Sequence, residues 1–270
     1  MPRRVALIAG SGSLVPPVIA AIRNSGDALS IISVTPREDL GADVVSLGGL
    51  KIAQLLDALR AFAPTHVALA GGIHISDDER RGLAYATGAE GVSPVGDMGL
   101  AAIAAKFETL TGARLIDLDA LVPEMLAPIG PIAGPEPTPE QQSVATFAFD
   151  RVRAAGALDL CQAVVASGHR LVAAEDIGGT DMLLERVRAF RDRGLIGTGT
   201  PLVLAKASKP GQPAFFDLPA IGPMTVSKAA DAGIGAIVVE AGRTLLLDRA
   251  ALESEAARHG VAVFGRRASD

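Results

Sequence analysis

The sequence contains no tryptophan, one tyrosine and eight phenylalanines, so aromatic residues make up only 3% of its 270 residues. Hydrophobic residues nevertheless reach 49%, which means that the core must be filled by Ala, Val, Leu and Ile. Short aliphatic runs are typical of strands that are buried on both faces in an α/β protein. A chain of this length fits either one large domain or two smaller ones.

Cysteine is also nearly absent. The single Cys161 cannot form an internal disulfide, and with four scattered histidines the sequence lacks the ligand spacing of a zinc site. Neither a Walker loop nor a Gly-x-Ser-x-Gly motif occurs, which excludes P-loop and classical serine-hydrolase chemistry.

Long apolar runs and excess positive charge are missing as well. The net charge is −5 with acids and bases interspersed, which disfavours a nucleic-acid partner. No run reaches the roughly 18 apolar residues of a membrane span, and the first, Val5–Ala9, is too short for a signal peptide. We expect a cytoplasmic protein, with peripheral contact to a lipid surface left open.

The N-terminal half alternates between strands and helices. This alternation predicts parallel βαβ units, and we interpret residues 1–130 as a Rossmann-like parallel sheet with helices. The expected strands are 5–9, 29–34, 66–70 and 113–118, and the expected helices are 14–22, 50–62, 77–85 and 97–110.

The second half reads differently. Residues 131–142 are rich in proline, which cannot sustain a helix or an inner strand, and we interpret them as a linker. Residues 143–270 are expected to form a mixed α/β domain with two hairpins, because aliphatic runs flank glycine turns twice. The hairpins are predicted at 162–174 and 236–247, and the helices at 142–155, 181–193, 223–232 and 249–259.

Two glycine turns of the first half are candidate ligand-binding loops. Gly10, Ser11 and Gly12 stand between a strand and a helix, where amides and the helix dipole favour an anion. Gly71 and Gly72 follow another strand and should line the same edge of the sheet. For the first loop, the alternative is a tight turn that binds no ligand. The nearby His74 could bond a phosphate or a base, and the alternative is an ordinary surface residue.

A nicotinamide cofactor is disfavoured at this edge. The dinucleotide fingerprint requires a third glycine, where Val15 stands, and the second strand ends in Val34-Thr35-Pro36 without the acid that binds ribose. A single phosphate or nucleoside site is therefore favoured.

The second half carries denser polar signals. Glu175 and Thr180-Asp181 surround a glycine turn after a strand, Lys206 and Lys209 follow another strand, and Asp217 lies in a proline-bounded loop. Carboxylates are the ligands that Mg²⁺ prefers, and lysines can neutralise phosphate. The alternatives are helix capping for Thr180 or Asp181, solvated charges for the lysines and a turn role for Asp217.

At these residues the chain resembles the UDP-2,3-diacylglucosamine pyrophosphatases of lipid A biosynthesis, of the type unrelated to calcineurin-like metallophosphatases. The resemblance runs nearly end to end. Its strings are Ile8-Ala-Gly-Ser-Gly12, Gly71-Gly72, Glu175 to Asp181, Lys206 to Gln212, Asp217-x-Pro-x-x-Gly222 and Glu240-Ala-Gly242.

The resemblance implies Mg²⁺-dependent hydrolysis of UDP-2,3-diacylglucosamine to UMP and 2,3-diacylglucosamine 1-phosphate (lipid X), with water attacking the α-phosphorus. It also implies two domains that close around the lipid-linked substrate, a homodimer, and contact with the inner membrane surface. An essential aspartate in the second half is implied, and we place it at Asp217.

The combined prediction assigns each residue a role. Asp217, Glu175 and Asp181 are the candidate catalytic residues, and Asp217 and Asp181 are the candidate metal ligands. A non-catalytic nucleotide-sugar binding or sensor module remains the alternative. The predicted substrate-binding residues are Gly10, Ser11, Gly12, Gly71, Gly72, Thr180, Lys206, Lys209 and Gln212.

Overall fold

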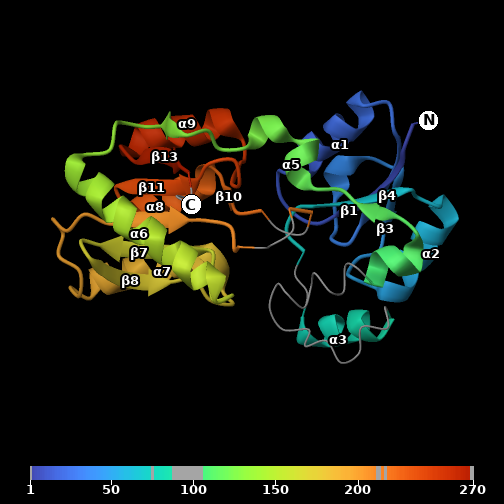
Figure 1. The fold of residues 1–270 in the computed structure, drawn as a ribbon, viewed down its shortest axis with the longest axis horizontal. Helices are drawn as coiled ribbons and strands as arrows, with labels where there is room; N and C mark the ends of the chain where they lie inside the picture. Colours follow the sequence, from blue (N-terminus) through green and yellow to red (C-terminus); the bar gives the residue numbers. More distant parts are fainter. Residues whose placement is uncertain (1, 74–75, 87–105, 211–213, 216–217, 268–270) are drawn as a thin grey trace. The chain divides into compact units, whose positions relative to one another are not determined.

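The computed structural model describes residues 2–73, 76–86, 106–210, 214–215 and 218–267. The chain divides into two compact units (Figure 1). The first unit comprises Met1–Pro123 with Gln212–Asp217, and the second comprises Glu124–Gly211 with Leu218–Asp270. The boundary thus falls earlier in the chain than the expected linker, and a short later segment returns to the first unit.

The first unit contains a five-stranded sheet in the order β3-β2-β1-β4-β5, and all of its strand pairs are parallel. The predicted Rossmann-like parallel sheet is therefore confirmed. Its strands are β1 (Arg4–Ala9), β2 (Ala28–Ser33), β3 (Val44–Ser46), β4 (His66–Ala70) and β5 (Arg114–Leu115).

The helices of this unit follow the predicted alternation. Most of the predicted helix 97–110 lies outside the described residues, although 106–111 are helical. The helices are α1 (Val15–Asn24), α2 (Ile52–Phe62), α3 (Asp77–Ala86) and α5 (Leu118–Leu121), with the 3-10 turn η1 (Glu38–Leu40), and the 3-10 turn η2 (Pro123–Met125) spans the boundary between the units.

The second unit contains a six-stranded sheet in the order β6-β13-β11-β9-β7-β8, which confirms a mixed α/β architecture. Its central strands β9, β11 and β13 are parallel, whereas β6, β7 and β8 pair in antiparallel fashion. These strands are β6 (Gly130–Ala133), β7 (Ala163–Ser167), β8 (Arg170–Ala174), β9 (Val203–Lys206), β11 (Ala236–Glu240) and β13 (Ala262–Arg266).

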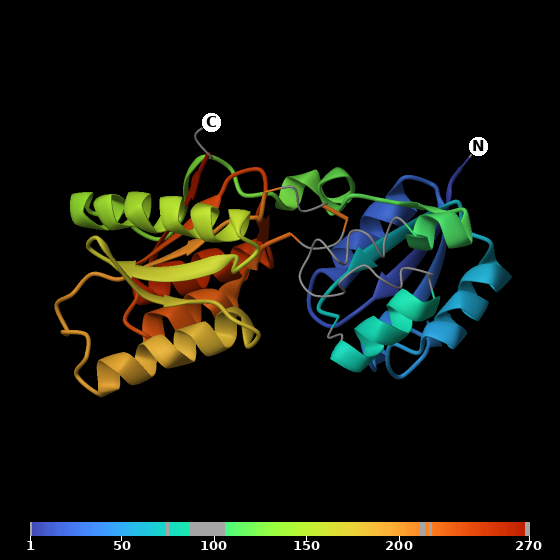
Figure 2. The same ribbon diagram turned by 60° about the horizontal axis from the view of Figure 1, so that its bottom comes forward.

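Helices cover both faces of this sheet (Figure 2). Val203 and Ala205 of β9 belong to the cluster packed against α6, whereas Leu202 and Leu204 belong to the cluster that includes α7, α8 and α9. Aliphatic side chains thus alternate between two cores, as expected for a strand buried on both faces. The helices are α6 (Pro139–Ala157), α7 (Gly179–Asp192), α8 (Pro223–Asp231) and α9 (Arg249–His259).

The expectation that residues 131–142 form a proline-rich linker is wrong, because most of this segment belongs to the secondary structure of the second unit. Pro131 lies in β6, an edge strand that pairs with β13, and Pro139 opens α6. Proline is tolerated at a sheet edge and in a first helical turn, where no amide hydrogen is required. A reciprocal capping box between Thr138 and Gln141 then fixes the start of the helix.

The hairpin predicted at 162–174 is confirmed as β7 and β8, but the one predicted at 236–247 is wrong. Strand β11 pairs with β9 and β13, both in parallel. The chain leaves the sheet after Glu240, and β12 (Leu245–Leu246) instead pairs in parallel with β10 (Ala220–Ile221). All five residues of β11 are buried, and its two parallel neighbours, β9 and β13, cover both of its edges.

Within the part of the chain that the structure describes, no helix combines the length and apolarity that crossing a membrane requires.

Candidate active-site edge

Polar residues gather where the parallel strands of the second sheet end. Lys206 ends β9, Glu240 ends β11 and Arg266 ends β13, and the register places Glu240 opposite Arg266 and Lys206 opposite Val239. Open α/β sheets bind ligands at the carboxyl ends of their strands. This edge is therefore the candidate active-site edge of the second unit.

Three predicted residues meet there in one hydrogen-bond network. The Lys206 ammonium donates to the Thr180 hydroxyl at 2.9 Å and to the Ala220 carbonyl at 3.0 Å. The Thr180 hydroxyl donates to Glu175 Oε1 at 2.6 Å, while the backbone N–H of Gln162 donates to Glu175 Oε2 at 3.2 Å. A cation and a carboxylate are thus held on one shared hydroxyl.

The turn after β9 is held in place by Ser208, Glu240 and Asp159, to which the sequence gave no role in the site. Both the N–H and the hydroxyl of Ser208 donate to Glu240 Oε2, at 2.9 and 2.7 Å. The predicted Lys209 forms an ion pair of 2.7 Å with Asp159. An acid that ends an aliphatic strand, as Glu240 does, is the signal that could have marked it, because such a group needs partners.

Asp181 is directed elsewhere. Its carboxylate forms an ion pair of 2.7 Å with Lys228 of α8, and 63% of its side chain is exposed. The expectation that Thr180 or Asp181 caps α7 is wrong, because the N-cap is Gly178 and no side chain caps the helix. Thr180 lies in the first turn and bonds Glu175 instead.

Two predicted site residues, Gln212 and Asp217, lie outside the described residues, so their roles stay predictions, and the same holds for His74, for which the sequence left a ligand role and a surface role open. Among the described residues, no group of three or more His, Cys, Asp or Glu side chains is close enough to hold a metal ion. A metal held by one or two carboxylates and the substrate would not require such a group.

The glycine turns of the first unit lie against each other at the carboxyl ends of β1 and β4. Gly10 N donates to the Ala70 carbonyl at 2.8 Å, and Ser11 and Gly72 exchange two backbone hydrogen bonds of 2.9 and 2.8 Å. A Cβ at Gly10 would lie 2.4 Å from the Gly72 oxygen. Glycine is therefore required here by close backbone approach.

These bonds restrict how the first loop can bind an anion. The amides of Gly10, Ser11 and Gly72 already donate to protein carbonyls. The first turn of α1 contains Pro16 and Pro17, which have no amide hydrogen. An anion at this loop must therefore use other donors of the loop than these three amides.

Arg37 is a further residue that sequence reasoning missed at this edge. Its guanidinium donates to the carbonyls of Gly10 and Gly12 at 2.9 and 3.0 Å, and it pairs with Asp39 at 2.6 Å. The hydrogen bond to Asp39 raises the pKa of Arg37. Arg37 thus fixes the carbonyl side of the glycine loop.

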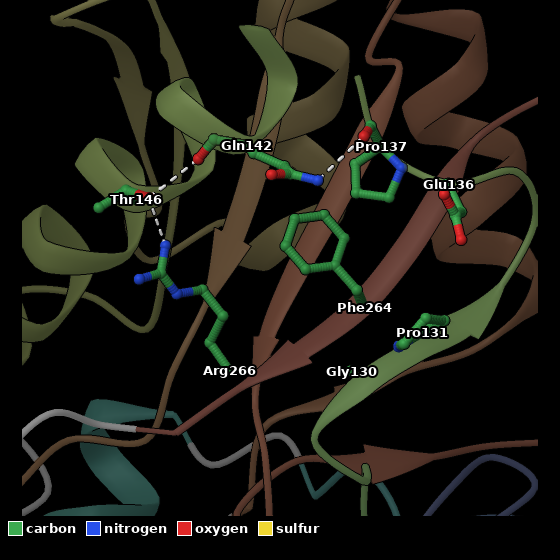
Figure 3. A pocket seen from close by; sticks show the side chains of 8 residues that line it. All are labelled: Gly130, Pro131, Glu136, Pro137, Gln142, Thr146, Phe264 and Arg266. Atoms are coloured by element: carbon green, nitrogen blue, oxygen red, sulfur yellow. Dashed lines mark hydrogen bonds between the residues drawn. The ribbon is translucent and has the colours of Figure 1, made fainter. Parts of the chain in front are cut away.

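An open pocket of about 510 Å³ in the second unit adjoins the candidate active-site edge, since Arg266 at the end of β13 also lines the pocket (Figure 3). Its polar groups largely satisfy one another: Arg266 donates to Thr146, Thr146 to the Gln142 carbonyl, and Gln142 to the Pro137 carbonyl. We therefore favour the network of Lys206, Thr180 and Glu175 as the site. The pocket is lined by Gly130, Pro131, Glu136, Pro137, Gln142, Thr146, Phe264 and Arg266, none of which was predicted as a site residue.

Comparison with known proteins agrees with the resemblance seen in the sequence. The family model described as the LpxI C-terminal domain matches residues 128–264, a range that overlaps the second unit. The UDP-2,3-diacylglucosamine pyrophosphatase LpxI of Caulobacter vibrioides is 33% identical over 279 aligned positions, which cover 97% of each chain. The chain therefore belongs to the LpxI family.

Proposed function

We propose that this protein hydrolyses the pyrophosphate bond of UDP-2,3-diacylglucosamine, releasing UMP and 2,3-diacylglucosamine 1-phosphate in lipid A biosynthesis. The observation that carries the proposal is the 33% identity with the Caulobacter vibrioides pyrophosphatase along 97% of both chains. Similarity over nearly the whole length of both proteins includes both units of this chain, rather than a single shared nucleotide-binding module.

The hydrogen-bond network at the candidate active-site edge supports phosphate chemistry. Lys206 is a cation whose position is fixed by Thr180 and by the Ala220 carbonyl. Fixed positive charge stabilises the negative charge that develops on the oxygens of a diphosphate under attack. In the proposed reaction Lys206 and Lys209 offset phosphate charge, and Glu175 holds the Thr180 hydroxyl that orients Lys206.

We further propose that Asp217 is essential for turnover and that water attacks the α-phosphorus. A divalent cation such as Mg²⁺, with Asp217 and Asp181 as ligands, would neutralise diphosphate charge when bound. Of these two acids the described residues contain Asp181, an exposed carboxylate, which fits a hard cation once it leaves Lys228. Chelation by EDTA should then abolish turnover, and added Mg²⁺ should restore it.

The glycine turns are proposed to bind the UMP moiety. Their support is the position at the carboxyl edge of a parallel sheet, where nucleotides commonly bind. Titration calorimetry with UMP tests this part, and Gly12→Asp should weaken binding at least tenfold, because it places a negative charge beside the phosphate.

Assembly and membrane contact belong to the same proposal. We propose a homodimer that touches the inner membrane surface peripherally, as the resemblance implies. Light scattering measures the first property, and flotation with vesicles of anionic phospholipid measures the second. A monomeric protein that does not float with vesicles would contradict both proposals and would leave the proposed hydrolysis unaffected.

The deciding experiment is hydrolysis in ¹⁸O-labelled water followed by phosphorus NMR. Attack at the α-phosphorus places the label in UMP, and attack at the β-phosphorus places it in the sugar phosphate. We expect label in UMP alone. Label in the sugar phosphate would overturn the site of attack, and intact substrate after long incubation would overturn the hydrolase proposal in favour of a binding module.

A further inference from the structure

Glu240 is a buried acid to which the proposed reaction assigns no role. Only 8% of its surface is exposed, although it ends a strand at the edge where the site residues gather. Burying a carboxylate is unfavourable unless hydrogen bonds compensate it. At Glu240 both bonds come from a single residue, since Ser208 donates through its N–H and its hydroxyl to the same oxygen.

The bonds from Ser208 fix a turn rather than a side chain alone. The turn Ala207–Pro210 follows β9 directly, and the N–H of Ala207 donates to the Gln162 carbonyl at 3.0 Å. The ion pair between Lys209 and Asp159 holds the turn from the other side. Three separate tethers therefore act on three consecutive residues.

The end of α6 is shaped to receive this turn. Gly156 has no side chain, and a Cβ there would lie 3.4 Å from Lys209 Cα and 3.5 Å from Pro210 Cδ. Asp159 follows the C-cap of α6 and adopts a φ of 56°, the left-handed conformation that commonly ends a helix, and from there its carboxylate reaches Lys209.

We infer that Glu240 is a positioning residue for the hydrolysis: through Ser208 it fixes the turn Ala207–Pro210 and so the cation of Lys209. This inference rests on the proposed function, which gives Lys209 its role at the phosphate. Because rates are sensitive to displacements of about 1 Å in such groups, loosening the turn should slow catalysis strongly.

Cys161 provides a readout of the turn that is independent of activity. It is the only cysteine in the sequence, it is buried, and it shares a hydrophobic cluster with Ala207. Burial also raises the pKa of its thiol, which keeps the reactive thiolate scarce. Opening of the turn should expose Cys161 and accelerate its labelling by a chromogenic disulfide reagent.

The experiment compares Ser208→Ala, Glu240→Ala and Glu240→Gln in the full chain. The control is Thr138→Ala, which removes a helix cap at the other end of α6 and costs about 1 kcal/mol of stability. For each variant we measure kcat and KM with UDP-2,3-diacylglucosamine, the thermal midpoint and the rate of Cys161 labelling.

We expect Ser208→Ala and Glu240→Ala to lower kcat about tenfold or more, with a smaller change in KM, and to speed Cys161 labelling. Glu240→Gln should recover most of kcat, because its amide oxygen can still accept from Ser208. Thr138→Ala should lose stability but keep kcat and the protection of Cys161.

Wild-type kcat in a folded Ser208→Ala protein would overturn the inference, and this holds even where Glu240→Ala fails to fold. Equal losses in Glu240→Gln and Glu240→Ala would also overturn it, because the charge itself would then be needed. If the wild type does not hydrolyse the substrate, both the proposed function and the inference that rests on it fail. If the wild type is active, the variants test the inference alone.

Discussion

The hydroxyl of Thr180 accepts a hydrogen bond of 2.9 Å from Lys206 while it donates one of 2.6 Å to Glu175. Thr180→Val keeps the shape of the side chain but removes both bonds. A hydrogen bond to a charged group contributes about 1.5–3 kcal/mol, so we expect kcat to fall at least about tenfold. Steady-state kinetics checks this, and Thr180→Ser, which keeps the hydroxyl, should retain most of the activity. Equal losses in the two variants would contradict an orienting role for the hydroxyl.

Replacing Asp217 distinguishes an enzyme from a non-catalytic binding module. Asp217→Ala should bind UDP-2,3-diacylglucosamine about as well as the wild type and lose turnover by about 100-fold or more, because losing a proposed Mg²⁺ ligand removes charge stabilisation from the transition state. Binding by calorimetry and release of UMP are measured on the same preparation. Full turnover by the variant would remove Asp217 from the mechanism.

The ion pair between Lys228 and Asp181 should compete with a metal ion for the carboxylate. Lys228→Met leaves Asp181 without this partner, so we expect half-maximal activity at a lower Mg²⁺ concentration, by about threefold for an exposed pair worth up to about 1 kcal/mol. Mg²⁺ titrations of activity give the value. As a control, Arg249→Met breaks an exposed pair with Glu253 and should leave the titration unchanged.

Gly71 has a φ of 87°, and a Cβ there would lie 2.4 Å from the Ser11 oxygen. Gly71→Ala should therefore lower the free energy of unfolding by more than the 1–2 kcal/mol that a left-handed backbone alone costs. Gly26→Ala is the matched control, since Gly26 has a φ of 74° with open space around it. Urea titrations compare the two, and equal losses would show that the contact with Ser11 does not matter.

Asp27 should make the stability of the protein depend on pH. Hydrogen bonds from Arg3, above all from its side chain, lower the pKa of Asp27 from 3.8 to about 2. A carboxyl with a lowered pKa in the folded state stabilises the protein above pH 3.8, and this contribution is lost as the pH falls through 2.

Asp27→Asn should thus lose about 1 kcal/mol at pH 7, a value discounted because the Arg3 side chain is 38% exposed. The difference from the wild type should shrink as the pH falls toward 2 and vanish below it. Urea titrations at several pH values measure it. Asp57→Asn, which breaks an exposed pair with Arg60, is the control and should lose little stability at pH 7. A difference for Asp27→Asn that does not change with pH would contradict the lowered pKa of Asp27.

Local pattern predicted most elements of both units, because aliphatic runs between glycine turns have few alternatives. His66–Ala70 and Arg249–His259 have the predicted bounds. The pattern was misleading for Pro131 and for Thr244 to Leu247. In both places the strand pairs with a strand that is distant in the sequence, β13 for β6 and β10 for β12, so the local residues do not reveal the partner.

The residues of the site also divide into those that the sequence predicted and those that it missed. Glu175, Thr180 and Lys206 were recognisable as polar residues at strand ends, and the structure brings them into one network. Glu240 with Ser208, and Arg37 with the glycine loop, were missed, because their partners are 32 and 27 residues away and no local spacing records such a contact.

By itself the sequence determined the α/β class, the two glycine turns and the family, since each of these depends on residue types in a fixed order along the chain. Only the tertiary structure decided that Asp181 faces Lys228 while Glu175 shares a hydroxyl with Lys206. The physical reason is that a charged side chain takes its role from the partners that folding places within about 3 Å, and those partners come from distant strands and helices.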